Sequence, residues 1–220
     1  MPSRAPVLIG LAAAAALAAV ALVLLRDGGA SVPETSPEPI AVDLGVRRLS
    51  VPRNAVRFAD QRLPAPQARL DLALVWPELE GRTIETATRF ETPDLSPDVV
   101  YVTLQPRRDG WDAASRLSAV YARFFVGEPW DGPAGLQGRR MAPKSGYGDE
   151  EIYLEPGAVR PFVARCFPLS PGEPPTVCLR DALHGEVLVT LRFPRTLLDH
   201  WRELDAALDA RLAGWGVETR

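Results

Sequence analysis

The hydrophobic and polar positions of this chain alternate with a period of two over several short stretches, which is the pattern of half-buried β-strands. One stretch, VVYVTLQ, is a nearly continuous run of β-branched and aromatic residues and therefore predicts a more buried strand. The predicted strands are VRRLSV (46–51), AVRFA (55–59), LDLALVW (70–76), VVYVTLQ (99–105), EEIYLE (150–155), and three at 162–167, 176–182 and 186–193. The last three follow one another through short turns, so they are expected to form an antiparallel meander.

Two other stretches have the 3.6-residue period of amphipathic helices. The first helix is expected over about 113–125, after the N-cap residue Asp112 and before Gly127. The second is expected over about 195–213, and Gly214 is a natural stop. Its apolar stripe consists of Leu197, Leu198, Trp201, Leu204, Leu208 and Leu212.

The stripe of the second helix could dock a partner or cover the sheet of its own chain. A sheet with one apolar face needs a second layer, and only two helices are predicted to provide it. Packing on the sheet is therefore favoured. The resulting fold class is α+β, a mainly antiparallel sheet covered by two helices.

An uncharged apolar run, VLIGLAAAAALAAVALVLL, occupies residues 7–25. As a helix it would be about 28 Å long, close to the hydrocarbon thickness of a bilayer. The sequence therefore predicts a transmembrane anchor over 1–26, with the lipid bilayer as a partner of residues 7–25. A cleaved signal peptide, which usually has a shorter apolar region, is the less favoured alternative. The Pro-, Ser- and Glu-rich stretch 27–39 predicts a solvated linker, followed by a folded domain over 40–220.

The two cysteines, Cys166 and Cys178, are the ends of the stretch CFPLSPGEPPTVC. The prolines between them cannot donate ladder hydrogen bonds, so this stretch predicts a loop that joins two strands. A disulfide across that hairpin is favoured over two reduced core cysteines. Their spacing is not that of a zinc site. Because disulfides persist in oxidising compartments, we expect a single-pass protein of the inner (cytoplasmic) membrane with its domain in the periplasm.

The charge of the chain limits its partners. The formal net charge is −3, so the chain as a whole offers no strong field to nucleic acid, and no nucleic-acid partner is predicted. Lys144 is the only lysine among 25 basic residues. The arginines are scattered in ones and twos, which is more typical of a coding bias than of a phosphate-binding surface.

Motifs for catalysis or metal binding are missing from the sequence. The two histidines, His184 and His200, have no second histidine or cysteine at ligand spacing. Neither a G-x-S-x-G elbow nor an S-x-x-K signature occurs. The acidic stretch GDEE at 148–151 is more typical of a solvated turn than of a calcium or acid–base site. No metal, cofactor or catalytic residue is therefore predicted.

The stretch 127–149 is rich in glycine and proline and predicts a long loop. Loops of that length often carry function, so its aromatic and arginine residues form a candidate binding loop. The candidates are Trp130, Arg139, Arg140 and Tyr147. In the alternative interpretation, Trp130 only pins the loop onto the core.

Two classes of function are compatible with this sequence. The favoured one is a non-enzymatic binding or assembly component of the cell envelope, with another envelope protein as its partner. The alternative is an envelope hydrolase that uses carboxylates such as Glu78, Glu80 or Asp149, for which no motif is present. A pocket lined by convergent carboxylates would favour the enzyme, whereas an exposed docking face would favour the binding protein.

Overall fold

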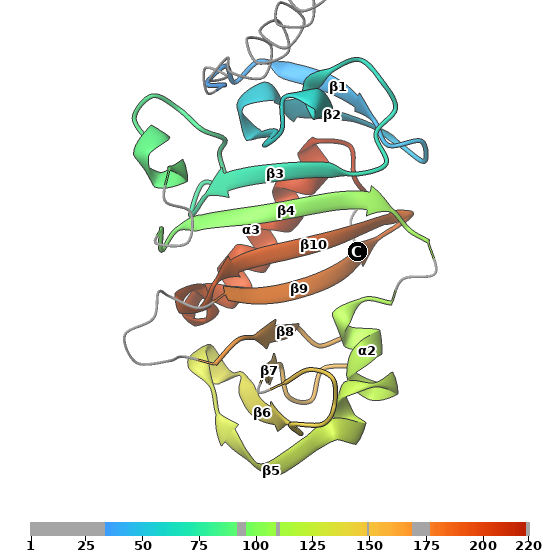
Figure 1. Cartoon of the computed structure of the whole chain (residues 1–220), viewed down its shortest axis with the longest axis vertical. Coiled ribbons are helices and arrows are strands. Elements are labelled where there is room, and N and C mark those ends of the chain that lie inside the picture. The colour runs from blue at the N-terminus through green and yellow to red at the C-terminus, as the bar shows by residue number, and fades with distance from the viewer. Residues whose placement is uncertain (1–33, 92–95, 109–110, 149, 169–176, 219–220) are drawn as a thin grey trace, which may run out of the picture. The chain divides into compact units, whose positions relative to one another are not determined.

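An eight-stranded antiparallel sheet in the order β3-β4-β10-β9-β8-β7-β6-β5 forms the framework of the chain (Figure 1). The computed structural model describes residues 34–91, 96–108, 111–148, 150–168 and 177–218. Within these ranges, no helix is both long and apolar enough to cross a membrane. The predicted span over 7–25 and most of the loop between the cysteines lie outside the described residues. The predicted fold class, α+β with a mainly antiparallel sheet, is confirmed.

Four long strands form one half of the sheet, which we call the long half-sheet. These strands are β3 (Leu70–Val75), β4 (Val99–Pro106), β9 (Val177–His184) and β10 (Val187–Pro194). β10 lies between β4 and β9 and pairs with β9 along their whole length, from Val187↔His184 to Pro194↔Val177. Their alternating Val and Leu residues place one continuous apolar face on the core side of this half.

Four shorter strands form the other half, which we call the short half-sheet. They are β5 (Phe125–Asp131), β6 (Gln137–Met141), β7 (Glu151–Leu154) and β8 (Val163–Cys166). The two halves meet between β8 and β9, which pair at Arg165↔Leu179 and Cys166↔Cys178, with a further hydrogen bond from Phe167 N to Val177 O. We call this junction the seam. The predicted meander of the last three strands is present as β8, β9 and β10.

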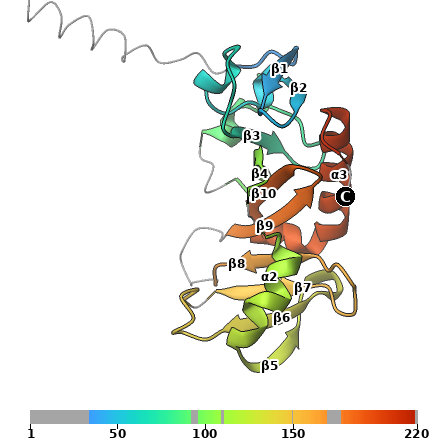
Figure 2. The same cartoon turned by 90° about the vertical axis from the view of Figure 1, so that its right-hand side faces the viewer.

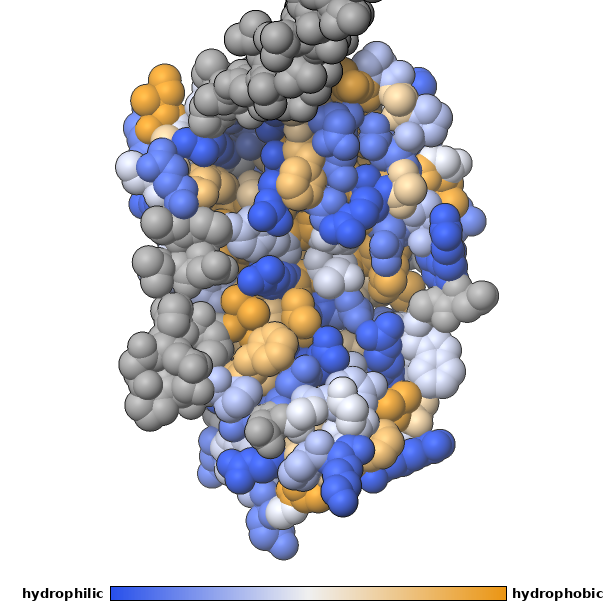
Figure 3. Space-filling view, in the orientation of Figure 1, coloured by the Kyte–Doolittle hydropathy of each residue, from blue (hydrophilic) through white to orange (hydrophobic). Residues whose placement is uncertain are grey.

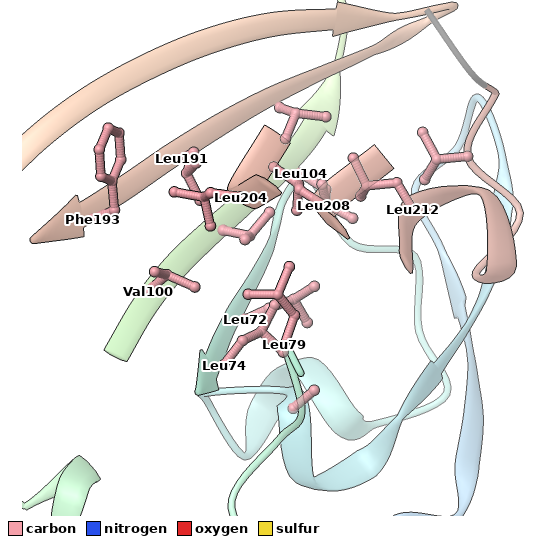
Figure 4. Packing of buried hydrophobic residues seen from close by; sticks show 14 of the residues in the cluster. Leu72, Leu74, Leu79, Val100, Leu104, Leu191, Phe193, Leu204, Leu208 and Leu212 are labelled. Atoms are coloured by element: carbon pink, nitrogen blue, oxygen red, sulfur yellow. The ribbon is translucent and has the colours of Figure 1, made fainter. Parts of the chain in front are cut away.

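One face of the long half-sheet is covered by the helix α3 (Trp201–Gly214), which follows the 3-10 segment η6 (Arg195–His200). Figure 2 shows α3 running along one side of the sheet. All six residues of the predicted stripe are buried, and Leu204, Leu208 and Leu212 pack into the main core (Figure 4). The predicted helix over 195–213 thus begins as a 3-10 segment and becomes an α-helix only at Trp201.

The short half-sheet is covered on its opposite face by α2 (Ala113–Ala119) and the 3-10 segment η4 (Tyr121–Phe124). The helix α2 begins where the Asp112 carboxylate accepts a hydrogen bond from Ser115 N, as expected of an N-cap. The residues packed between α2 and the short half-sheet form a second core cluster, which consists of Ala113, Tyr121, Met141, Ile152 and Val163. The helix predicted over 113–125 is therefore shorter, because the chain tightens into a 3-10 turn and then enters β5.

The N-terminal strands differ from the prediction. β1 (Pro39–Asp43) pairs with β2 (Arg48–Pro52), and the strand predicted at 55–59 does not form. The chain turns instead through the 3-10 segment η1 (Arg53–Ala55), because the Asn54 backbone and side chain are held by hydrogen bonds to Ser36 and Arg82. Three other 3-10 segments are η2 (Asp60–Arg62), η3 (Ala87–Phe90) and η5 (Pro133–Gly135).

The prediction of a long loop over 127–149 is wrong, since this stretch contains most of β5 and all of β6. The pattern is hard to recognise because β5 is an edge strand with both faces largely exposed, and its register shifts between Val126 and Trp130. The strand predicted at 99–105 is present as β4, in which buried and half-buried positions alternate after Val100. In β4, Tyr101, Thr103 and Gln105 are half-buried on the face opposite α3.

Candidate functional site

The face of the long half-sheet opposite α3 has no helix over it in the described part of the chain (Figure 1). We call it the open face. Its side chains come from the strand positions that alternate with the core positions, among them Asp71, Tyr101, Thr103, Leu179, Asp181, Thr190 and Arg192. Figure 3 shows hydrophilic residues spread over this side of the molecule, with apolar groups between them. Asp71 is buried, most of the other residues named here are half-buried, and Arg192 is exposed.

A row of polar side chains crosses the four strands of the open face. The strand register places Asp71 beside Thr103, Thr103 beside Thr190, and Thr190 beside Asp181. The Thr103 hydroxyl donates to Asp71 Oδ1 at 2.8 Å, and the Thr190 hydroxyl donates to Asp181 Oδ1 at 2.7 Å. At the ends of the row, Arg69 and Arg116 form ion pairs with the two aspartates. The hydrogen-bonding capacity of the two carboxylates is therefore largely used within the face itself.

The Asp71 carboxylate is the most buried charge of this row. Its main-chain N and its side chain both bond to Gln61, at 2.8 and 3.0 Å, and Arg69 Nε donates to Asp71 Oδ2 at 2.8 Å. Burial acts to raise the pKa of Asp71, but the hydrogen bonds from Arg69, Gln61 and Thr103 outweigh it and lower the pKa. Asp71 is therefore a fixed anion with structural partners, unlike a carboxyl group prepared for proton transfer.

Tyr101 is the centre of an arginine–aromatic stack beside this row. The Arg57 guanidinium lies 4.8 Å from the centroid of the Tyr101 ring and 5.0 Å from that of Phe58. Arg192, directly across the strand pair, lies 6.0 Å from the same Tyr101 ring. Two guanidinium groups therefore flank one ring, and Arg57, Phe58 and Arg192 are all exposed.

Among the described residues, arginines outnumber aspartates on and beside the open face. Five arginines (Arg57, Arg69, Arg108, Arg116 and Arg192) accompany two aspartates, Asp71 and Asp181. A hollow of about 460 Å³ beside the polar row is lined by Arg69, Arg108, Arg116, Gln105, Leu188 and two neighbours.

A second hollow, of about 400 Å³, lies at the seam, where β8 stops pairing with β9. Arg180, which is 6% exposed, extends from β9 to Asp205 of α3 at 3.0 Å. Asp112, at the start of α2, accepts hydrogen bonds from Ser115 and from Arg160 at 3.0 Å; burial acts to raise its pKa, but these bonds lower it. Asp181 and Asp209 also line the hollow, and their partners are Arg116, at 2.7 Å, and His184, at 3.6 Å. The Arg180–Asp205 and Arg116–Asp181 pairs attach α3 and α2 to β9.

The two predicted disulfide residues lie opposite each other at the seam. Cys166 of β8 and Cys178 of β9 are paired in register and joined by a disulfide, with their Cα atoms 4.0 Å apart. Both are fully buried in the main core. The bond therefore crosses the junction at which the two half-sheets share only two residue pairs.

Of the four residues of the predicted binding loop, two lie together: the Arg140 guanidinium is 6.0 Å from the centroid of the Trp130 ring. Trp130 packs edge-on against Tyr153 at 6.1 Å, and the ring lies so close to Gly138 that a side chain there would collide with it. Tyr147 packs edge-on against Tyr121 at 5.4 Å. Arg139 is half-buried, whereas Arg140 is exposed. The two aromatic residues therefore have packing partners, and binding by this set stays a prediction.

The candidate catalytic carboxylates are not brought together. Glu78 and Glu80 are exposed, and both lie near Arg211: Arg211 donates to Glu78 O, and its guanidinium is 3.5 Å from Glu80 Oε1. Asp149 lies outside the described residues. Burial raises the pKa of Glu150, but its carboxylate is only 3.0 Å from Arg165 Nε and lines neither hollow. Within the described ranges, no three His, Cys, Asp or Glu side chains form a group that could hold a metal ion.

The residues of the open face are not among the site residues predicted from the sequence. In β4, Tyr101, Thr103 and Gln105 stand at every second position, and each has a side chain that can form hydrogen bonds. This alternation could have predicted that one face of the strand lies outside the core. No local signal relates Arg57 to Tyr101. Their contact depends on how the segment after η1 lies against β3 and β4.

No family model matches this sequence, and no curated protein matches it significantly. Solved structures do have a similar fold. One is an immunity protein of the Stenotrophomonas maltophilia type IV secretion system, with a TM-score of 0.56, 16% identity, and coverage of 81% of this chain and 93% of that chain. Another is the Neisseria meningitidis iron-regulated outer membrane lipoprotein FrpD, with a TM-score of 0.49, 10% identity, and coverage of 80% and 95%. At such identities the likeness to the first establishes a shared fold.

Proposed function

We propose that this chain is a non-enzymatic binding protein of the cell envelope that acts as an immunity-type protein, protecting its own cell by binding a toxic protein. The observation that carries the proposal is the open face. It is a sheet surface bordered by arginines, in which Tyr101 contacts the exposed Arg57 and Arg192 and a hydrogen-bonded polar row lies beside them. Tyr and Arg are the side chains most enriched at the energetic centres of protein interfaces.

Fold-level analogy supports the class of partner. A known immunity protein shares this fold over most of both chains. Because one fold can serve many functions, this likeness only raises the expectation of protein binding, and the site has to support it independently. The open face does so, since its carboxylates are held by structural partners and its exposed groups are suited to contact.

The proposal includes a location. Residues 7–25 anchor the chain in the inner membrane, and residues 34–220 fold in the periplasm, where the Cys166–Cys178 disulfide is stable. Protease added to intact spheroplasts is expected to digest the domain, and protection of the domain would contradict this topology. Recovery of the domain in the soluble periplasmic fraction would show a cleaved signal peptide instead of an anchor.

Growth competition tests the function. A strain that lacks this chain is mixed on a solid surface with its parent, and the survivors of both are counted. We expect survival of the deletion strain to fall by about tenfold or more, and to be restored by the wild-type chain. In liquid culture at low density, where cells rarely touch, the two strains are expected to grow equally. Equal survival on the surface would overturn the immunity role.

A further inference from the structure

We propose that the hollow beside the polar row binds the phosphate group of a small phosphate ester. This cavity, which we call the basic hollow, has a volume of about 460 Å³ and lies where β4 ends and β3 and β10 begin. It is lined by Ala68, Arg69, Gln105, Pro106, Arg108, Arg116 and Leu188. Such a ligand is distinct from the protein partner of the proposed function, and its binding does not depend on the immunity role.

Three guanidinium groups converge on the basic hollow from separate parts of the chain. Arg69 precedes β3, Arg108 follows β4, and Arg116 belongs to α2. Gln105, whose amide can also donate, is the fourth polar residue of the lining, and none of the described residues that line the hollow is an Asp or Glu. Arginine matches phosphate oxygens with paired N–H donors. The lining therefore has the composition of an anion site.

Two of the three guanidinium groups are held in place by other residues of the chain. Arg69 donates through Nε and Nη2 to the Asp71 carboxylate, and Arg116 donates through Nη1 to Asp181 Oδ2 at 2.7 Å. Arg116 also bonds to the side chain of Tyr121. An arginine has five N–H donors, so these bonds leave further donors on each group. Because both side chains are already oriented, less side-chain entropy is lost when an anion binds.

Arg108 provides the positive charge that the polar row does not balance. Asp71 and Asp181 offset the charges of Arg69 and Arg116, with which they form ion pairs. Arg108 is exposed, and within the described part of the chain no carboxylate forms an ion pair with it. The hollow therefore keeps one excess positive charge, at a side chain on which the fold does not depend.

The shape and size of the basic hollow favour a phosphate ester over a carboxylate or a bare ion. A carboxylate has two oxygens in one plane, which a single guanidinium can satisfy, whereas a phosphate ester has three acceptor oxygens in different directions. Three guanidinium groups from three elements suit the second arrangement.

The basic hollow also has room for the organic part of an ester. Its volume is far larger than a phosphate group needs, since one water molecule takes up about 30 Å³. Ala68, Pro106 and Leu188 line it with apolar groups, against which an organic substituent can pack. Small-molecule sites commonly have volumes of about 300–1,000 Å³ and combine apolar lining with a few polar groups.

Thermal unfolding of the full chain in detergent, followed by tryptophan fluorescence, tests the site. The probe is glycerol 3-phosphate, and acetate at the same ionic strength tests the carboxylate alternative. Phosphate salts can also stabilise a fold without binding to a site. Each probe is therefore applied to wild type, to Arg108→Gln and to the matched control Arg123→Gln, an exposed arginine of η4 that does not line the hollow.

We expect glycerol 3-phosphate, at about ten times its Kd for wild type, to raise the unfolding midpoint of wild type by about 3–6 °C. Loss of the charged contact in Arg108→Gln should weaken binding about tenfold and reduce the rise to about 1 °C at the same concentration. The rise in Arg123→Gln should equal that of wild type, and acetate should give no rise that depends on Arg108.

A lipid headgroup can supply the same chemistry as a soluble ester. Phosphatidic acid, in which the phosphate is also esterified to glycerol, is therefore added in mixed micelles as a second arm. A rise with glycerol 3-phosphate that depends on Arg108 supports a soluble ester, and such a rise with phosphatidic acid alone supports a lipid headgroup. If neither arm gives a rise that depends on Arg108, if Arg123→Gln reduces the rise as much as Arg108→Gln, or if acetate acts as strongly as the ester, the phosphate site is wrong.

Discussion

Each half-sheet buries an apolar face under a helix, but the strands and the helix are longer in one half than in the other. In the long half-sheet, β4, β9 and β10 each have eight residues, and the fourteen-residue helix α3 covers one face. In the short half-sheet, β7 and β8 have four residues each, and the seven-residue helix α2 covers the opposite face. The difference is one of apolar area: long strands and a long helix can bury a large core, whereas the short half depends on its attachment to the long one.

An open face exists because the helices α2 and α3 cover opposite faces of the sheet. Since α3 packs behind the long half-sheet and α2 packs in front of the short one, the front of the long half-sheet receives no helix in the described chain. Its strands are already stabilised from the other side. The front face can therefore carry polar and charged side chains that do not serve the core.

The largest loss of stability should come from a substitution in α3, the helix that covers the long half-sheet. Leu204 of α3 is 1% exposed, so Leu204→Ala should lower the free energy of unfolding by about 2–5 kcal/mol. Leu117 of α2 is only partly buried on the short half-sheet, so Leu117→Ala should cost about 1 kcal/mol. Urea unfolding of the full chain in detergent, followed by tryptophan fluorescence, measures both. Equal losses would contradict the proposed difference between the halves.

The disulfide should have the next largest effect. Replacing Cys166 and Cys178 by alanine should lower the free energy of unfolding by about 3 kcal/mol, because the bond closes a short loop in the unfolded chain. The domain should still fold, since the long half-sheet has its own core. Hydrogen exchange should then rise more in β6, β7 and β8 than in β4 and β10. Uniform exchange across both halves would show that the seam is not the weak junction.

The same contrast explains how much could be predicted from sequence. The strands β9 and β10 and the stripe of α3 have long, regular periods, because each buries one complete face. The hydrophobic pattern of β5 has little periodicity, because β5 is an exposed edge strand that contains Gly127 and Pro129. The open face could not be predicted, because the register that places Arg192 against Tyr101 is a property of the paired strands and not of either one.

Neutralising Asp71 should have a moderate, pH-dependent effect. Asp71→Asn should lower the free energy of unfolding by about 1–3 kcal/mol at pH 7, because Arg69 loses its charged partner. The pKa of Asp71 is lowered in the folded chain, so its stabilising contribution is present above the unfolded pKa of about 3.9 and is lost as the pH falls through the folded value. The variant should therefore lose less stability than wild type between pH 5 and pH 3.

Urea unfolding at a series of pH values measures this difference, and Asp60→Asn, an exposed aspartate of η2, is the control. The control should follow the wild-type pH dependence. An Asp71→Asn chain with the same pH dependence as wild type would show that the polar row does not stabilise the fold through this charge.

The smallest effect on stability should come from the outer arginines of the open face. Arg57 and Arg192 are exposed and contact Tyr101 on the side away from the core, so Arg57→Gln with Arg192→Gln should change the free energy of unfolding by about 0.5 kcal/mol or less. Arg180, by contrast, is buried on the core side of β9 and paired with Asp205, so Arg180→Gln should cost several times more. Thermal unfolding of the three chains compares them directly. If the two outer arginines prove as costly as Arg180, their role is to stabilise the fold. If they are neutral to stability, then a loss of protection in the growth competition can be attributed to binding at the open face.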